Sequence, residues 1–366
     1  MTKPTLSRRN FSKMIAVGAA YAALGSKARA LTPDAASNIV RLSSNENPYG
    51  PSPAALKAMT DSFSLAWRYP DEYADILAEE LARGHGVPVD QVLLGDGSGE
   101  ILKLCAAAFT GRNKLVIANP TFEAVVRHAG VANADVVKID LTSDYSHDLK
   151  KMLAASNGAG LVYICNPNNP TASITPKSEI SDFLAKVSPT TIVLVDEAYH
   201  HYVDSKDYES VIPLVKQYPN LIVARTFSKI YGMAGLRCGY CVTQRGNIVQ
   251  LKTHQIFDSV NIMALVAALA SLKDPEQVAR GQKLNNEVKK TVYAELDALG
   301  YRYIPSHANF MMIDLRREVR PIINALRNRG VEVGRLFPPL PNFMRVTIGT
   351  ASQMKTFLTA FREVMV

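Results

Sequence analysis

Lys229 is the residue whose type and surroundings most directly suggest chemistry. It ends the segment Thr226-Phe-Ser-Lys229, which follows an apolar run of strand length and precedes Tyr231-Gly-Met-Ala-Gly235. Burial among apolar groups favours the neutral form of a lysine, and the neutral amine is the nucleophile that forms a Schiff base with an aldehyde. Most lysines are solvated surface groups, so this segment predicts a nucleophile only if other residues support it.

A carboxylate at the end of another expected strand gives that support. The apolar run Thr191–Val195 precedes Asp196, and Tyr199 lies three residues further on. Ligands of parallel sheets bind at the carboxyl ends of the strands, and a carboxylate at the end of an apolar strand is costly unless it is paired. A protonated pyridine nitrogen is a suitable partner. The loop Asn166–Thr171 adds amides that do not titrate, and Phe122 could stack on a flat ring.

A glycine-rich turn is a candidate phosphate site. Gly95-Asp-Gly-Ser-Gly-Glu100 follows the expected strand Val92–Leu94 and opens a helix, and the amides at a helix start bind phosphate oxygens. A nicotinamide-binding unit would carry an acidic residue at the end of the next strand, about 20 residues on. That strand, Leu115–Ala118, ends in Asn119-Pro120 instead. The turn therefore favours a phosphate site or a simple strand-to-helix connection over a nicotinamide dehydrogenase.

Apolar runs of strand length alternate with amphipathic helical segments over most of the chain. This alternation predicts an α/β fold whose large domain holds a mostly parallel seven-stranded sheet sandwiched by helices. After Asn261 the pattern changes to longer helical segments and then to short strands at Phe310–Asp314 and Met344–Ile348, which predicts a smaller α+β domain. The expected boundaries are a signal peptide at 1–30, an N-terminal segment packing on the small domain at 31–60, the large cofactor-binding domain at 61–260 and the small domain at 261–366.

The net charge of +8 is concentrated in the first thirty residues, which hold six cations and no acidic residue. The segment Ser7-Arg8-Arg9-Asn10-Phe11-Ser12-Lys13 resembles a twin-arginine export signal, and the apolar run Met14–Leu24 and the cleavage site Ala28-Arg29-Ala30 follow it in the expected order. We therefore expect export of a folded, cofactor-loaded protein to the periplasm. The apolar run is too short to span a membrane as a helix. The mature chain would carry +2, so its charge does not predict a nucleic-acid partner.

The four cysteines are expected to be buried free thiols. Cys238 and Cys241 form an isolated C-x-x-C pair within an expected strand, where residues three apart point to opposite faces. The chain has no second pair at zinc spacing, and its length does not require disulfide stapling. We therefore predict neither a metal site nor a disulfide framework.

Together these segments resemble the fold-type I pyridoxal-phosphate aminotransferases of class I and II, and within them the chain is similar to the histidinol-phosphate aminotransferases. The resemblance extends from about Leu42 to the C-terminus. Single motifs are weak, but their order and spacing together are specific. Segments carrying the resemblance include Ser44–Pro53, Arg68–Asp71, Gly95–Glu100, Asn166–Thr171, Asp196–Tyr199, Arg225–Tyr240 and Phe343–Thr350.

The resemblance implies a role for each matching residue. Lys229 would bond covalently to the cofactor and move the substrate's α proton, and Asp196 would pair with the pyridine nitrogen. Asn169 and Tyr199 would hydrogen-bond the phenolic oxygen, and Phe122 would stack on the ring. The remaining positions are phosphate contacts at Ser98, Gly99, Ser228 and Arg237, Tyr69 reaching the phosphate of the neighbouring subunit in a homodimer, and substrate contacts at Arg345, Arg335 and Asn47.

The implied reaction is a ping-pong transfer of an amino group from an amino acid, or an amine resembling histidinol phosphate, to a 2-oxo acid. Two features depart from the histidine-biosynthetic members. Residues 31–41 lack the aromatic residue usual in the N-terminal arm, and the chain carries an export signal. Ala172 also replaces the glycine usual after Asn-Pro-Thr, which we expect to affect turn geometry more than chemistry.

Three alternatives remain at this stage. A pyridoxal-phosphate decarboxylase or lyase, such as one resembling threonine-phosphate decarboxylase, would use nearly the same residues. A non-catalytic binding protein of this fold is disfavoured because Lys229, Asp196, Tyr199, Asn169 and Arg237 occur together. A nicotinamide dehydrogenase would show hydride-dependent absorbance and no yellow colour.

Overall fold

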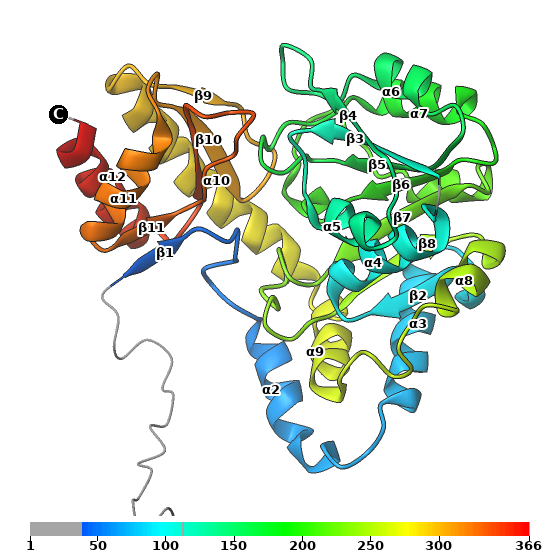
Figure 1. Ribbon diagram of the computed structural model, residues 1–366. Helices are drawn as coiled ribbons and strands as arrows, with labels where there is room; N and C mark the ends of the chain where they lie inside the picture. Colours follow the sequence, from blue (N-terminus) through cyan, green and yellow to red (C-terminus); the bar gives the residue numbers. More distant parts are fainter. Residues whose placement is uncertain (1–38, 112, 366) are drawn as a thin grey trace, which may run out of the picture. The chain divides into compact units, whose positions relative to one another are not determined.

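Seven of the apolar runs form one large sheet in the computed structural model, which describes residues 39–111 and 113–365 (Figure 1). The strand order is β2-β8-β7-β6-β5-β3-β4. Strand β8 is antiparallel to both of its neighbours, and the other pairs are parallel. The predicted α/β class with a mostly parallel sheet is confirmed. The strands are β2 (Val92–Gly95), β3 (Lys114–Asn119), β4 (Val136–Asp140), β5 (Ala159–Cys165), β6 (Ile192–Asp196), β7 (Leu221–Thr226) and β8 (Gly239–Thr243).

Helices cover both faces of this sheet. Successive residues of a strand point to opposite faces, so Val193 and Val195 of β6 join one apolar core while Ile192 and Leu194 join the other. One core includes α3 (Asp71–His85), α6 (Leu149–Ala155), α7 (Lys177–Lys186) and α9 (Ile262–Leu272), and the other includes α4 (Gly97–Phe109), α5 (Ala124–Val131) and α8 (Arg245–Lys252). Burial on both faces explains why strands β5 to β8 are apolar almost throughout.

A separate core forms around two small sheets near the chain ends. Strands β12 (Phe343–Thr347), β10 (Phe310–Asp314) and β9 (Arg302–Ile304) pair antiparallel in that order, and β1 (Val40–Leu42) pairs in parallel with β11 (Val331–Val333). The strands expected at 310–314 and 344–348 are therefore present, the second shifted by one residue. The remaining helices are α2 (Pro53–Asp61), α10 (Pro275–Ala298), α11 (Val319–Asn328) and α12 (Ala351–Met365), with 3-10 turns at Phe63–Leu65, Val89–Gln91, His200–Tyr202 and Ile212–Lys216.

The three-residue strands β1, β9 and β11 were not predicted, because such short runs show no alternation. The domain boundaries near residues 60 and 260 stay a prediction, and the signal peptide at 1–30 lies outside the described residues. All four cysteines are buried and free, as expected. Among residues 39–111 and 113–365, the helices lack the length and apolarity needed to cross a bilayer.

His147 makes the stability of this fold sensitive to acid. Its side chain is buried, with Nδ1 2.7 Å from Thr175 Oγ1 and Nε2 without a hydrogen-bond partner. Burial lowers the pKa of His147 to about 4, whereas an unfolded histidine titrates near 6.5. Below pH 6.5 His147 binds a proton in the unfolded chain but stays neutral in the folded protein. The free energy of unfolding therefore falls as the pH drops toward 4.

We expect His147→Asn, which keeps a polar atom near the Nδ1 position, to flatten this dependence. Between pH 7 and pH 5 the wild-type protein should lose about 2 kcal/mol more unfolding free energy than the variant. Urea unfolding of both proteins at the two pH values measures the difference. Equal losses in the two proteins would contradict the assignment.

Candidate active site

A cavity of about 380 Å³ lies at the carboxyl ends of the central strands. Parallel strands end at the same edge of a sheet, so residues distant in sequence meet there. Ten of the predicted residues line this cavity: Ser98, Gly99, Phe122, Asn169, Asp196, Tyr199, Ser228, Lys229, Arg237 and Arg345. The structure thus brings together the residues on which the sequence-based hypothesis depends.

Lys229 is half-buried in the cavity wall. Its Nζ lies 3.1 Å from the carbonyl oxygen of Asn45 and 3.5 Å from that of Ser44. Burial, followed by the positive charge of Arg345, lowers the pKa of Lys229 to about 8. A large fraction of neutral amine is therefore present at mildly alkaline pH, which is the state required for attack on an aldehyde.

Asp196 is buried at the end of β6, with a hydrogen bond to each carboxylate oxygen. The backbone N–H of Ala198 donates to Oδ1 at 3.1 Å, and the Tyr163 hydroxyl donates to Oδ2 at 2.9 Å. Burial raises the pKa of Asp196 to about 6, against the lowering effect of the Tyr163 hydrogen bond. The carboxylate is ionised at neutral pH and can pair with a cation in the cavity.

Tyr199, Asn169 and Arg345 form a connected polar group on another wall. Asn169 and Asn45 donate to the Tyr199 hydroxyl at 3.4 and 3.1 Å, and burial holds the pKa of Tyr199 above its ordinary value, so the phenol stays protonated. Arg345 donates from Nη1 to Asn169 Oδ1 and from Nη2 to the Ser43 carbonyl, each at 2.7 Å. Its Nε is buried without a hydrogen-bond partner. Each Nη carries a second N–H, so this guanidinium has donors left for an anion.

The remaining wall is the start of α4 facing Arg237. Amides in the first turn of a helix have no intrahelical partner and bind anions. Gly97 has a φ of +71°, and a Cβ there would lie 2.3 Å from Arg237 Nη2. A Cβ on Gly239 would lie 2.3 Å from the amide nitrogen of Ser98. Both glycines are therefore needed for Arg237 and β8 to approach this turn.

Three predicted residues lie outside the cavity. Asn47 turns its side chain to the Ile230 carbonyl at 2.9 Å, and Asn45 lines the cavity instead. Arg335 is exposed and paired with Glu123 at 2.7 Å. Tyr69 is 81% exposed. The sequence motif Ser44–Pro53 contains both asparagines, and no spacing rule distinguishes Asn45 from Asn47.

The turn at Ala172 keeps the geometry that glycine favours. Its φ is +57°, in the left-handed region, and its methyl group is buried. Its carbonyl accepts a hydrogen bond from the backbone N–H of His307 at 2.8 Å. The turn is thus formed in spite of the replacement noted in the sequence.

The family model for aminotransferases of class I and II matches residues 37–361. The chain belongs to this family. The histidinol-phosphate aminotransferase of Moorella thermoacetica is 39% identical to this aminotransferase over 333 residues, covering 90% of this chain and 86% of that protein. The predictions of a transaminase that uses pyridoxal 5'-phosphate are confirmed.

Solved structures of other proteins have the same fold. The histidinol-phosphate aminotransferase of Sinorhizobium meliloti in complex with pyridoxal-5'-phosphate matches this aminotransferase with a TM-score of 0.85 and 26% identity, covering 89% of this chain and 91% of that one. The L-threonine-O-3-phosphate decarboxylase of Porphyromonas gingivalis matches with a TM-score of 0.77 and 22% identity, covering 89% and 99%. At that identity the second likeness shows the fold alone.

The cavity of this aminotransferase fits the cofactor by the chemistry of its donors. An amine with a lowered pKa suits the aldehyde, an ionised buried carboxylate suits the ring nitrogen, and helix-start amides with an arginine suit the phosphate. Bound pyridoxal 5'-phosphate supplies an electron sink for the substrate's Cα. The protein orients the substrate, pairs with the charged groups of the cofactor and moves the proton of the substrate's Cα.

Proposed function

We propose that this aminotransferase moves an amino group between an amino acid and a 2-oxo acid, with Arg345 receiving the carboxylate of each. The observation that carries the proposal is the position of Arg345 on the cavity wall, where each of its two Nη atoms donates one N–H to the protein and keeps a second for an anion. One arginine serves both half-reactions because donor and acceptor each carry a carboxylate beside the reacting carbon. Histidinol phosphate is the second candidate donor, supported by the name of the Moorella relative.

The residue roles that we propose are supported by the family match and by the lining of the cavity. Lys229 would hold the cofactor through its amine and would take the proton from the substrate's Cα. Asp196 would hold the ring nitrogen, Asn169 and Tyr199 would contact the phenolic oxygen, and Phe122 would cover the ring face. Ser98, Gly99, Ser228 and Arg237, which line the same cavity, would hold the phosphate.

A spectroscopic half-reaction screen tests this proposal. The purified, cofactor-loaded protein is mixed with single amino acids, aromatic ones included, and with histidinol phosphate, and a 2-oxo acid is then added. Loss of the cofactor's yellow colour with a donor, and its return with an acceptor, is the expected result. Release of carbon dioxide and an amine would instead identify a decarboxylase.

The pairing of Arg335 affects whether the active site binds an amino donor that carries a second anionic group. Its guanidinium is paired with Glu123 and stacks 4.4 Å from the centre of the Phe337 ring, which also lies 5.1 Å from Arg345. A distal phosphate must compete with Glu123 for Arg335. This competition favours donors with a single anionic group.

We expect Glu123→Gln to lower KM for histidinol phosphate about threefold while leaving KM for neutral-side-chain amino acids unchanged, because an exposed ion pair contributes up to about 1 kcal/mol. Glu363→Gln, which alters the exposed pair with Arg329, is the matched control. Equal changes for both donor classes would argue against a role for Arg335 in distal recognition.

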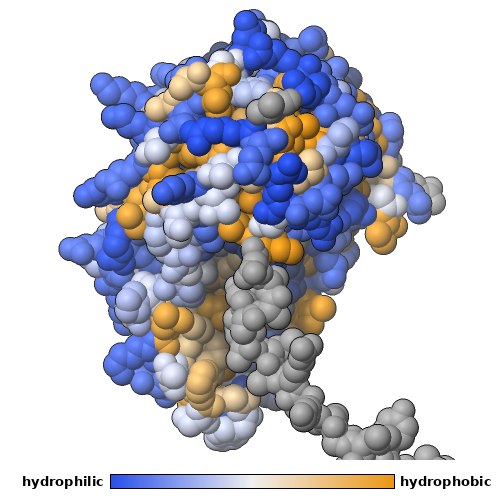
Figure 2. All heavy atoms as spheres, turned by 90° about the vertical axis from the view of Figure 1, so that its left-hand side faces the viewer, coloured by the Kyte–Doolittle hydropathy of each residue, from blue (hydrophilic) through white to orange (hydrophobic). Residues whose placement is uncertain are grey.

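We also propose a homodimer in which Tyr69 of the partner subunit contacts the cofactor phosphate. Large side chains are exposed between α2 and α3, with Phe63, Trp67 and Tyr69 each more than 60% exposed. Figure 2 shows some hydrophobic surface near the lower end of the visible face, the end at which α2 lies in Figure 1, in addition to hydrophobic patches higher on the same face. Exposed aromatic clusters of this kind are typical of subunit interfaces.

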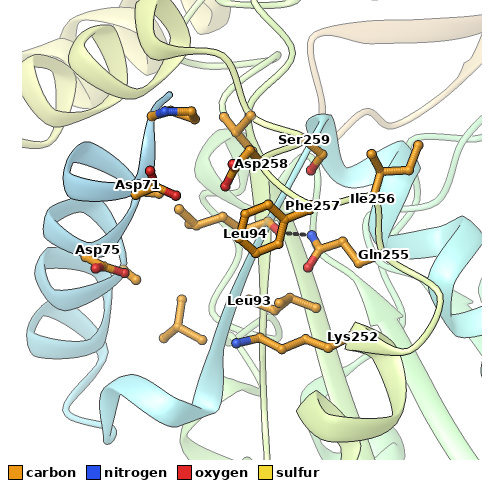
Figure 3. Close-up of a pocket in the computed structure, with 15 residues that line it drawn as sticks. Asp71, Asp75, Leu93, Leu94, Lys252, Gln255, Ile256, Phe257, Asp258 and Ser259 are labelled. Carbon is orange, nitrogen blue, oxygen red and sulfur yellow. Dashed lines mark hydrogen bonds between the residues drawn. The ribbon is translucent and has the colours of Figure 1, made fainter. Parts of the chain in front are cut away.

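A cavity beside α3 extends this apolar surface. Figure 3 shows Asp71 and Asp75 of α3 on one side of it, and Phe257 and Ile256 on the other. Phe257 is 86% exposed, and covering it favours association. Light scattering should give the mass of a dimer, and Phe257→Asp should shift the protein toward a monomer.

We propose that residues 1–30 direct export by the twin-arginine route to the periplasm. The support is the sequence pattern alone, since these residues lie outside the described part of the chain. Fractionation of a bacterial host expressing the full chain tests the proposal. Replacing Arg8 and Arg9 with lysine should retain the protein in the cytoplasm.

A further inference from the structure

Tyr163 lies in strand β5, outside the lining of the active-site cavity, and its hydroxyl donates to Asp196 Oδ2 at 2.9 Å. We propose that Tyr163 is a positioning residue that keeps the Asp196 carboxylate ionised and oriented toward the ring nitrogen of the cofactor. This inference rests on the proposed role of Asp196. Tyr163 itself acts through the carboxylate and not on the substrate.

The surroundings of Tyr163 explain why a phenol needs this partner. The side chain is fully buried in an apolar core that includes Leu161, Leu194 and Ile222. A phenylalanine would fill nearly the same volume without a polar atom, whereas a buried hydroxyl costs free energy unless it is hydrogen-bonded. The hydrogen bond to Asp196 offsets that cost.

The sheet register places the two groups within reach. Cys165 of β5 is opposite Asp196 of β6, and Tyr163 lies two residues before Cys165, on the same face. With the Ala198 amide on Oδ1 and Tyr163 on Oδ2, both oxygens of Asp196 are held. The carboxylate therefore has a fixed rotation about its side chain, and it retains lone pairs for the cavity.

The hydrogen bond from Tyr163 also favours the ionised form of the Asp196 carboxyl group. Burial pushes the Asp196 carboxyl toward its neutral form, which could not pair with a protonated ring nitrogen, and the Tyr163 hydroxyl opposes that shift in pKa. Among the other titratable groups around Asp196, Lys229 favours the anion and Glu197 disfavours it. Burial raises the pKa values of Cys165, Tyr199 and Tyr208, so these groups stay neutral.

The test compares Tyr163→Phe with Tyr202→Phe, which removes a hydroxyl from another buried tyrosine. A hydrogen bond to a charged group contributes about 1.5–3 kcal/mol, so Tyr163→Phe should raise the dissociation constant of pyridoxal 5'-phosphate at least tenfold. We expect kcat to fall with little change in donor KM. The acid limb of the pH profile and of the cofactor absorbance titration should both move up by about one pH unit. Tyr202→Phe should leave all five quantities unchanged.

An Asp196→Asn background separates positioning from a general packing effect. If Tyr163 acts through the carboxylate, adding Tyr163→Phe to Asp196→Asn should change cofactor affinity less than twofold. Wild-type affinity and pH profile in Tyr163→Phe, or an equal loss in both backgrounds, would overturn the inference. Failure of the wild-type protein to bind the cofactor would instead overturn the proposed function of the site.

Discussion

Lys229→Ala should abolish transamination, with kcat falling at least about 10³-fold, because the variant loses both the covalent attachment of the cofactor and the base that moves the α proton. The yellow colour that accompanies covalent attachment should also be absent. Steady-state kinetics and an absorbance spectrum of the variant with added cofactor measure the two effects. Lys206→Ala removes an exposed lysine and should behave as the wild-type protein.

The lowered pKa adds a second signature of Lys229. With a pKa of about 8, the amine loses its proton as the pH rises through 8, and only the neutral amine attacks the aldehyde. The rate of covalent attachment to cofactor-free protein should therefore rise with pH and level off above about 8. A rate that continues to climb toward pH 10.5 would indicate an ordinary, solvated lysine.

Glu197→Ala should cost about 3–5 kcal/mol of unfolding free energy, the largest stability effect that we expect in this chain. Glu197 Oε2 accepts from Arg225 at 2.8 and 2.9 Å and from Ser210 at 2.8 Å, and Oε1 accepts from the Val211 amide at 2.8 Å. Both partners of the ion pair are buried. Removing the carboxylate leaves a buried guanidinium without its counter-charge.

The matched control for this ion pair is Asp61→Ala, which breaks the exposed pair with Lys57 and should cost less than about 0.5 kcal/mol. The double variant Glu197→Leu with Arg225→Met should recover much of the loss, since apolar side chains replace a buried pair at small cost. The urea midpoints of the wild-type protein, Glu197→Ala, Asp61→Ala and the double variant measure these differences in stability. A loss in Glu197→Ala no larger than in Asp61→Ala would show that the pair is solvated.

The sequence predicted the residues whose positions follow from strand ends. Asp196 and Lys229 each follow an apolar run, and parallel strands bring such residues to one edge. Tyr163 was missed because its contact with Asp196 depends on the register between β5 and β6, which no pattern within a single strand reveals. The pairing of Arg335 with Glu123 joins positions 212 residues apart, so sequence proximity gave no sign of it.

The hydrogen bond from Arg345 to the Ser43 carbonyl joins β12, the last described strand, to the residue that directly follows β1, the first one. The cavity wall therefore needs the segment after β1, which a ribosome makes early, and β12, which it makes near the end. A nascent chain that stops before β12 holds Lys229 and Asp196 but lacks the closing wall. The complete cavity can accordingly form only after nearly the whole chain has been synthesised.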